Sequence, residues 1–221
     1  EANEGRAYLY LGTSSGLSTT AGWIGESNQA YAYYGVSVST AGDINGDGYS
    51  DVVVGAYYYD NIENSEGQAL VYLGSSSGLA TTASWTGESN LAFAYYGYSV
   101  GTAGDVNGDG YSDVLVGAYA YSNGESGEGR AYLYHGSASG LSTTTAWTGE
   151  SNQAYSYYGL SVSSAGDVNG DGYSDVVVGS YFYTNGEANE GRAYLYHGSA
   201  SGDRKSTRLN SSHRCISYAV F

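Results

Sequence analysis

The chain has 221 residues and a formal net charge of −15, with one cysteine, no methionine and no proline. A chain this acidic is a poor partner for nucleic acid or for an anionic membrane surface. Nine of its eleven aspartates lie in three short loops, so a large part of the negative charge belongs to one recurring kind of segment.

The chain is built from a repeat of 62 residues. Four glycines, at positions 5, 67, 129 and 191, are in phase, and so are Trp23, Trp85 and Trp147. The units are residues 5–66, 67–128 and 129–190, and a partial fourth unit covers 191–202. Repeats of this length are typical of solenoids, propellers and arrays, in which one unit cannot bury its own apolar face.

Each repeat is predicted to contain four short strands. Around the second acidic loop these are residues 98–103, 113–121, 130–136 and 143–149. They are rich in β-branched and aromatic residues and bounded by glycine and serine clusters, as strands are. Four strands per repeat indicate a propeller blade, so we expect two strands of one blade, two whole blades and three strands of another.

The acidic loop has the pattern D-x-N-x-D-G-x-x-D and precedes the second strand of each repeat. It supplies side-chain oxygens at positions 1, 3, 5 and 9 and a backbone carbonyl at position 7, with glycine at the turn. Such a set suits a hard cation, so the sequence predicts three Ca²⁺ sites. The predicted ligands are Asp43, Asn45, Asp47, Tyr49 and Asp51; Asp105, Asn107, Asp109, Tyr111 and Asp113; and Asp167, Asn169, Asp171, Tyr173 and Asp175.

Other interpretations of the loop are weaker. A polar turn without metal would leave three carboxylates repelling one another. A helix–loop–helix calcium hand needs glutamate at position 12, where this chain has Val54, Val116 and Val178. Dockerin modules share the acidic core but continue into helix, whereas strand-forming residues follow here.

The loop is framed by Tyr34-Gly35 on one side and by Gly55-Ala56-Tyr57 on the other, and the frame recurs in both later repeats. This arrangement resembles the FG-GAP repeat of integrin alpha-subunit propellers and of many bacterial surface proteins, over residues 1–202. The resemblance implies an all-β fold of four-stranded antiparallel blades, cut as an incomplete arc from a seven-bladed propeller of a longer protein. Tyrosine replaces the family's phenylalanine, and the family's proline is Tyr57, Tyr119 or Tyr181 here.

The resemblance also implies a function in extracellular recognition or adhesion, at the cell surface or after secretion, with calcium stabilising the scaffold. The expected ligand is an extracellular protein or glycan, bound by loops opposite the calcium loops: residues 60–66, 122–128 and 184–190, and residues 25–31 and 87–93. No membrane insertion is expected. The alternatives are a carbohydrate-binding or non-catalytic module of a secreted enzyme, or a passive spacer.

The remaining conspicuous residues are interpreted as structural. The three tryptophans are expected to pack between blades, and the outer tyrosines of YAYYG, FAYYG and YSYYG to be the ones that contact a ligand. His135 and His197 occupy a position filled by leucine in the other copies, so it is interpreted as a packing site. We find no catalytic set and expect no enzyme. Residues 203–221 break the repeat and are expected to be an artefactual or disordered tail.

Overall fold

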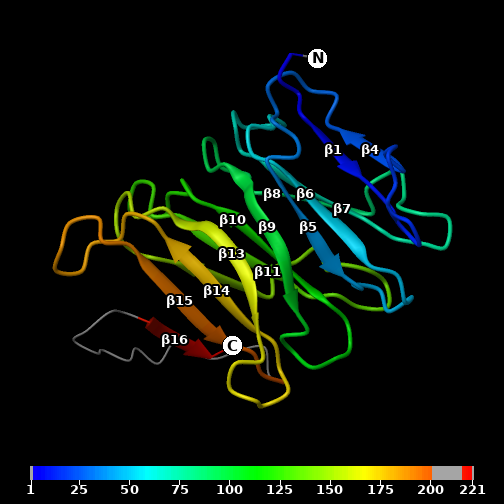
Figure 1. Ribbon diagram of the computed structural model, residues 1–221. Coiled ribbons are helices and arrows are strands. Elements are labelled where there is room, and N and C mark those ends of the chain that lie inside the picture. Colours follow the sequence, from blue (N-terminus) through cyan, green and yellow to red (C-terminus); the bar gives the residue numbers. More distant parts are fainter. Residues whose placement is uncertain (1, 201–215, 221) are drawn as a thin grey trace.

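The computed structural model describes residues 2–200 and the strand Ile216–Val220. This part of the chain is all-β (Figure 1). It contains no helix, and hence none long and apolar enough to cross a bilayer.

The strands form sheets that follow the repeat. The first sheet has only β1 (Arg6–Leu9) and β4 (Trp23–Glu26), with a small hairpin of β2 (Gly12–Thr13) and β3 (Gly16–Leu17) between them in sequence. The second sheet consists of β5 (Ser37–Gly42), β6 (Asp51–Ala56), β7 (Gln68–Tyr72) and β8 (Trp85–Glu88). The third consists of β9 (Tyr96–Gly104), β10 (Asp113–Ala118), β11 (Arg130–Tyr134) and β12 (Trp147–Glu150). The last contains β13 (Tyr158–Gly166), β14 (Asp175–Ser180), β15 (Arg192–His197) and β16 (Ile216–Val220).

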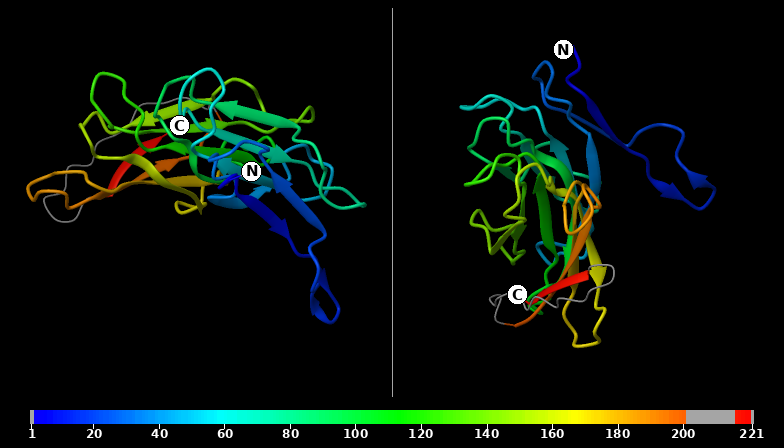
Figure 2. Two further views of the ribbon diagram at one scale, coloured as in Figure 1. Left: turned by 90° about the horizontal axis from the view of Figure 1, so that it is seen from above. Right: turned by 90° about the vertical axis from the view of Figure 1, so that its left-hand side faces the viewer.

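This pattern confirms the predicted propeller blades. Neighbouring strands of the two whole blades are antiparallel and follow one another in sequence order. The expected first strand at 98–103 is longer, at Tyr96–Gly104, and the expected fourth strand at 143–149 begins later, at Trp147. The blades stand side by side in an open arc, and no closed ring forms from the described strands (Figure 2).

The segment predicted to be a tail lies largely outside the described residues. Its exception is β16, which pairs with β15 in parallel. In the two whole blades the fourth strand runs antiparallel to the third. The fourth strand of the last sheet therefore runs in the opposite direction to the fourth strands of the two whole blades.

The core lies between successive blades, and the tryptophans are part of it. Trp85 is buried, packs edge-on against Tyr134 with ring centroids 4.8 Å apart, and donates its indole N–H to the carbonyl of Ser142 at 2.9 Å. Trp23 makes the same bond to Ala80 of the following blade. These contacts confirm that the two tryptophans pack between blades and are not exposed platforms.

The framing motif makes the closest contact between blades. A Cβ on Gly55 would lie 1.8 Å from the carbonyl oxygen of Gly97, and a Cβ on Gly117 would lie 2.0 Å from that of Gly159. No side chain fits these positions, which explains why the motif needs glycine on both sides of the junction.

The tyrosine that replaces the family's phenylalanine is also explained. Tyr96 is fully buried and its hydroxyl donates to the hydroxyl of Tyr134 at 2.8 Å. Burial raises the pKa of Tyr96 well above its usual value. The equivalent pairs are Tyr34 with Tyr72 and Tyr158 with Tyr196. The extra hydroxyl is thus satisfied inside each blade.

Candidate metal loops and aromatic face

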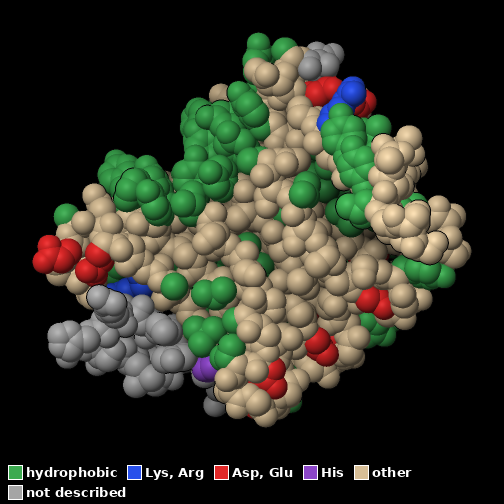
Figure 3. All heavy atoms as spheres, in the orientation of Figure 1, with side chains coloured by type: hydrophobic (Ala, Val, Ile, Leu, Met, Phe, Trp, Pro, Cys, Tyr) green, Lys and Arg blue, Asp and Glu red, His purple; other side chains and the backbone are tan. Residues whose placement is uncertain are grey.

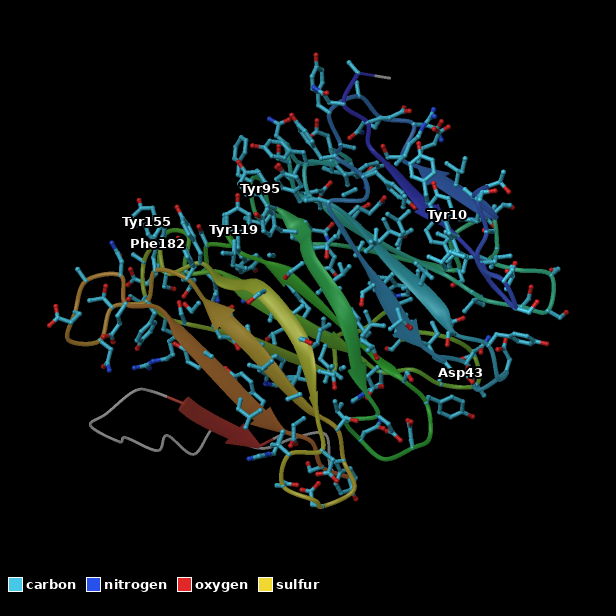
Figure 4. The ribbon with its side chains drawn as sticks, in the orientation of Figure 1. Tyr10, Asp43, Tyr95, Tyr119, Tyr155 and Phe182 are labelled. Atoms are coloured by element: carbon cyan, nitrogen blue, oxygen red, sulfur yellow. The ribbon has the colours of Figure 1, made fainter. Side chains whose placement is uncertain are left out.

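The three acidic loops lie at one end of the blades. Each joins the first strand of a blade to the second, as residues 43–51 join β5 to β6. Asp43, in the first loop, is far from the labelled aromatic residues Tyr95, Tyr119, Tyr155 and Phe182 (Figure 4). The chain therefore has two distinct candidate surfaces, one acidic and one aromatic.

Within a loop, the first aspartate organises the turn. Asp43 accepts the N–H groups of Gly46 at 2.7 Å and Asp47 at 3.1 Å through Oδ1, and that of Gly48 at 2.9 Å through Oδ2. Gly48 has a φ of +87°, which explains the glycine at position 6. Both later loops repeat these bonds. In the third loop, hydrogen bonds from the N–H of Gly172 and from other backbone N–H groups lower the pKa of Asp167.

The last aspartate of each loop has a structural role that the sequence did not reveal. Asp51 is fully buried; its Oδ2 accepts the N–H of Ile44 at 2.9 Å and its Oδ1 accepts that of Gly74 at 2.8 Å. Burial is the main influence on its pKa and raises it. Asp113 and Asp175 make the equivalent bonds. This carboxylate therefore ties the start of the loop to the end of the third strand.

The donor set of the loops fits a hard cation in its chemistry. Each of the five predicted ligand positions offers an oxygen along a turn of nine residues, and a carboxylate oxygen that accepts one hydrogen bond keeps a lone pair free. Among the described residues, no three acidic, histidine or cysteine side chains already converge on one point. The three calcium sites therefore stay a prediction.

Neighbouring loops are bonded to one another. The N–H of Ser174 donates to the carbonyl of Asp105 at 2.8 Å, and the N–H of Asp105 donates to Ser174 Oγ at 3.2 Å. The ring of Tyr173 covers Gly108, where a Cβ would lie 2.6 Å from Cε1. The predicted metal loops thus form one continuous array across the blades.

The two histidines at the repeated leucine position contact this array. His135 Nδ1 lies 3.2 Å from Asp113 Oδ1, and this interaction raises the pKa of the histidine. His197 lies at the same distance from Asp175. Both are only partly exposed, in keeping with a packing position, although the contact with a buried aspartate was not expected.

The opposite ends of the blades carry a continuous aromatic band. Ring centroids lie 5.0 Å apart between Tyr58 and Tyr95, 5.3 Å between Tyr95 and Tyr119, and 5.5 Å between Tyr119 and Tyr157. The band consists of Tyr33, Tyr57, Tyr58, Tyr95, Tyr98, Tyr119, Tyr157, Tyr181 and Phe182. It crosses three blades and forms large apolar patches on the surface (Figure 3).

Beside the band, each repeat presents one further aromatic residue from a strained backbone. Tyr31, Phe93 and Tyr155 are more than half exposed and have φ values of +63°, +59° and +56°. A bulky residue with positive φ is uncommon and costs on the order of 1–3 kcal/mol, and such strain gathers at functional sites. These are the outer aromatic residues of the predicted motifs; the sequence identified the residues but not their strain.

The two groups of loops predicted to bind ligand meet on this same side. Gln29 donates from Nε2 to the carbonyl of Asp60 at 2.7 Å, and its Oε1 accepts the N–H of Asp60 at 2.8 Å. Gln153 holds Thr184 in the same way. Residues 25–31 and 60–66 therefore form one surface next to the aromatic band.

Blades of four antiparallel strands, with an acidic loop between the first two, define a propeller-type repeat protein. The sequence profile of the FG-GAP repeat matches residues 34–73, 96–134 and 158–196, together just over half of the chain. Each match begins at the buried tyrosine that starts or closely precedes the first strand, and it ends at or next to the end of the third strand. The chain belongs to the FG-GAP repeat family.

Integrin alpha chains are among its relatives. The chain is 36% identical over 85 residues to integrin alpha-IIb of Mus musculus. This alignment covers 38% of this chain and 8% of that protein. It is 36% identical over 80 residues to integrin alpha-8 of Gallus gallus, covering 36% of this chain and 7% of that protein. The aligned region thus spans less than a tenth of the length of either relative.

Proposed function

We propose that this chain is part of a non-enzymatic, extracellular recognition or adhesion propeller, in which calcium stabilises the scaffold and the aromatic face contacts the ligand. The observation that carries the proposal is the aromatic band with its strained outer residues. Aromatic side chains on a rigid scaffold supply large contact area at small entropic cost. The integrin relatives support placement outside the cell.

The ligand class is an extracellular protein or a glycan. Glycan binding through exposed tryptophans was one alternative, and the burial of Trp23 and Trp85 argues against it. The exposed rings of Tyr31, Phe93 and Tyr155, beside the aromatic band, are candidates for contact with either class of ligand. In a passive spacer, nothing would offset the free-energy cost of a strained, exposed aromatic residue in every repeat.

The test is a binding screen against glycan arrays and extracellular matrix proteins at about 1 mM calcium, within the range at which extracellular modules bind this ion. Tyr31, Phe93 and Tyr155 are replaced together by alanine. The matched control is Tyr49→Ala, which removes an exposed tyrosine at the acidic end.

The proposal expects the triple variant to lose a ligand that the wild type and Tyr49→Ala bind. If a ligand still binds the triple variant but does not bind Asp109→Ala, in protein shown to be folded, the binding site lies on the acidic face. Absence of any binding across the panel would favour the spacer.

A further inference from the structure

The sequence has five Asn-Gly dipeptides, and their surroundings in the fold differ. Three lie in the acidic loops, at Asn45, Asn107 and Asn169, and two lie in the loops between the second and third strands of a blade, at Asn123 and Asn185. Asparagine is a chemically labile residue. We infer that Asn123 is a site of spontaneous deamidation to aspartate and isoaspartate, whereas the hydrogen bonds of the acidic loops protect the asparagines within them.

The reaction needs a free backbone nitrogen in the residue that follows the asparagine. That nitrogen loses its proton and attacks the side-chain carbon Cγ, the Cγ–Nδ2 bond breaks, and the amide nitrogen leaves as ammonia. Water then opens the cyclic imide at either carbonyl group, which gives aspartate or isoaspartate. Glycine leaves this approach unobstructed because it has no Cβ. A hydrogen bond from its N–H retains the proton and fixes the nitrogen in place, so such a bond slows the reaction.

In the acidic loops, the glycine nitrogen makes such a hydrogen bond. The N–H of Gly108 donates to Asp105 Oδ1 at 2.7 Å. The Asn107 side chain is held as well, because Oδ1 accepts the N–H of Asp109 at 3.1 Å and Nδ2 donates to Asp109 Oδ2 at 2.9 Å. The first and third loops have the same three bonds. These bonds must break before the nitrogen can reach Cγ, so the protection does not depend on a bound metal.

At Asn123, the following nitrogen is free. Among the described residues, the N–H of Gly124 has no hydrogen-bond partner. Its φ is +101°, and a Cβ on this glycine would meet nothing within 4 Å. The Asn123 amide makes two long contacts, of 3.3 and 3.4 Å, from Nδ2 to the carboxylate of Glu150. Both Asn123 and Gly124 are exposed, so water can reach the imide.

The hydrogen bond, and not exposure, separates the two kinds of site, since Gly108 is exposed as well. The first repeat supplies a second comparison. Its Asn61 occupies the position of Asn123, but the next residue is Ile62, whose N–H donates to Glu66 Oε1 at 3.0 Å. A β-branched side chain and a bonded N–H both obstruct the attack, and the second repeat lacks both.

Deamidation changes the loop that supports an exposed aromatic residue. The amide that donates to Glu150 becomes a carboxylate, so an attraction becomes a repulsion. Isoaspartate also lengthens the main chain of the loop by one carbon atom. The same loop holds the strained Tyr155, whose N–H donates to the carbonyl of Ser126 at 2.7 Å. Because ammonia is lost, the change is one-way and accumulates with the age of the molecule.

The test is peptide mass mapping of the folded chain after prolonged incubation in mildly alkaline buffer with excess chelator, which keeps metal out of the acidic loops. Isoaspartate is detected by its enzymatic methylation. Asn123→Gln is the control, because the longer side chain disfavours ring closure while the amide remains. Asp105→Ala removes the acceptor of the Gly108 N–H. A sample unfolded in guanidinium gives the rate of each dipeptide without the fold.

We expect Asn123 in the folded chain to deamidate at least about tenfold faster than Asn107, which corresponds to an opening free energy of about 1.4 kcal/mol for the acidic loop. The two rates should converge in guanidinium, and position 123 should stay unmodified in Asn123→Gln. In folded Asp105→Ala, Asn107 should react faster and Asn123 as before.

Equal rates at Asn123 and Asn107 in the folded wild type would overturn the inference, and so would an Asn123 that stays as intact as the glutamine of the control. An Asn107 that is equally slow in folded Asp105→Ala would show that the hydrogen bond is not what protects it. Should Asp105→Ala fail to fold, the comparison of folded and unfolded wild type decides.

Discussion

Asp43 and Ser112 hold neighbouring blades together through two reciprocal hydrogen bonds. The N–H of Ser112 donates to the carbonyl of Asp43 at 2.9 Å, and the N–H of Asp43 donates to Ser112 Oγ at 3.2 Å. Asp43 is also the first predicted calcium ligand. The predicted metal loops are therefore part of the inter-blade contact, so a change in one loop acts on the neighbouring blade.

Ser112→Ala should lower the free energy of unfolding by about 1 kcal/mol, because it removes the acceptor of the Asp43 N–H. Thr145→Ala, which removes an exposed hydroxyl, is the control and should change stability by less than about 0.5 kcal/mol. Denaturant unfolding of both variants checks this. Equal effects would show that the serine hydroxyl adds nothing to the junction.

Asp109→Ala and Asp113→Ala should respond differently to calcium although both change predicted ligands. Asp109 is exposed, so its loss should destabilise the chain in calcium and have little effect in chelator, where it relieves repulsion between carboxylates. Asp113 is buried and accepts the N–H groups of Val106 and Gly136, so its loss should cost about 2–4 kcal/mol in both conditions. Thermal unfolding in calcium and in chelator separates the two, and identical profiles would refute the division of roles.

Tyr96→Phe should destabilise the fold by about 1–3 kcal/mol, because it leaves the buried hydroxyl of Tyr134 without its partner. The double variant Tyr96→Phe/Tyr134→Phe should recover most of this loss, because no polar group is then stranded. The double-mutant cycle is measured by denaturant unfolding. A double variant whose loss equals the sum of two single losses would contradict the pairing.

The fold should lose stability in alkali. Burial raises the pKa of Tyr196 to about 12 and also raises the pKa of Tyr158 well above the value of about 10 that a free tyrosine has. Because the folded state holds these protons more tightly, their contribution is complete below pH 10 and is lost as pH rises from 10 towards 12 and beyond. Unfolding midpoints at pH 8 and 11 test this, and equal midpoints would contradict it.

The repeat explains why so much of the fold was predictable. In-phase glycines and tryptophans gave the period of 62 residues, and strand composition gave four strands per blade, because one unit recurs with the same environment. The role of Asp51 was not predictable, since its partner Gly74 is 23 residues away and the bond depends on burial. Likewise the strain at Tyr31 arises from a backbone angle that composition does not encode.

The pairing of Tyr96 with Tyr134 was also beyond the sequence. The sequence shows a tyrosine at both positions, but a hydrogen bond between hydroxyl groups 38 residues apart depends on how β9 and β11 are placed in one blade. The aromatic band could not be predicted for a similar reason: its residues were recognisable one by one, but only the packing of neighbouring blades brings the ring of Tyr58 within 5.0 Å of that of Tyr95.

The most direct test of the central proposal is the melting temperature of the chain in excess chelator and in about 1 mM calcium, with calorimetric titration of the bound ion. At a Kd of about 0.1 mM, each site should add about 1.4 kcal/mol, so three sites should add about 4 kcal/mol. The account predicts a clear rise in melting temperature and about three ions per chain. A melting temperature unaffected by calcium, with no saturable binding, would contradict it.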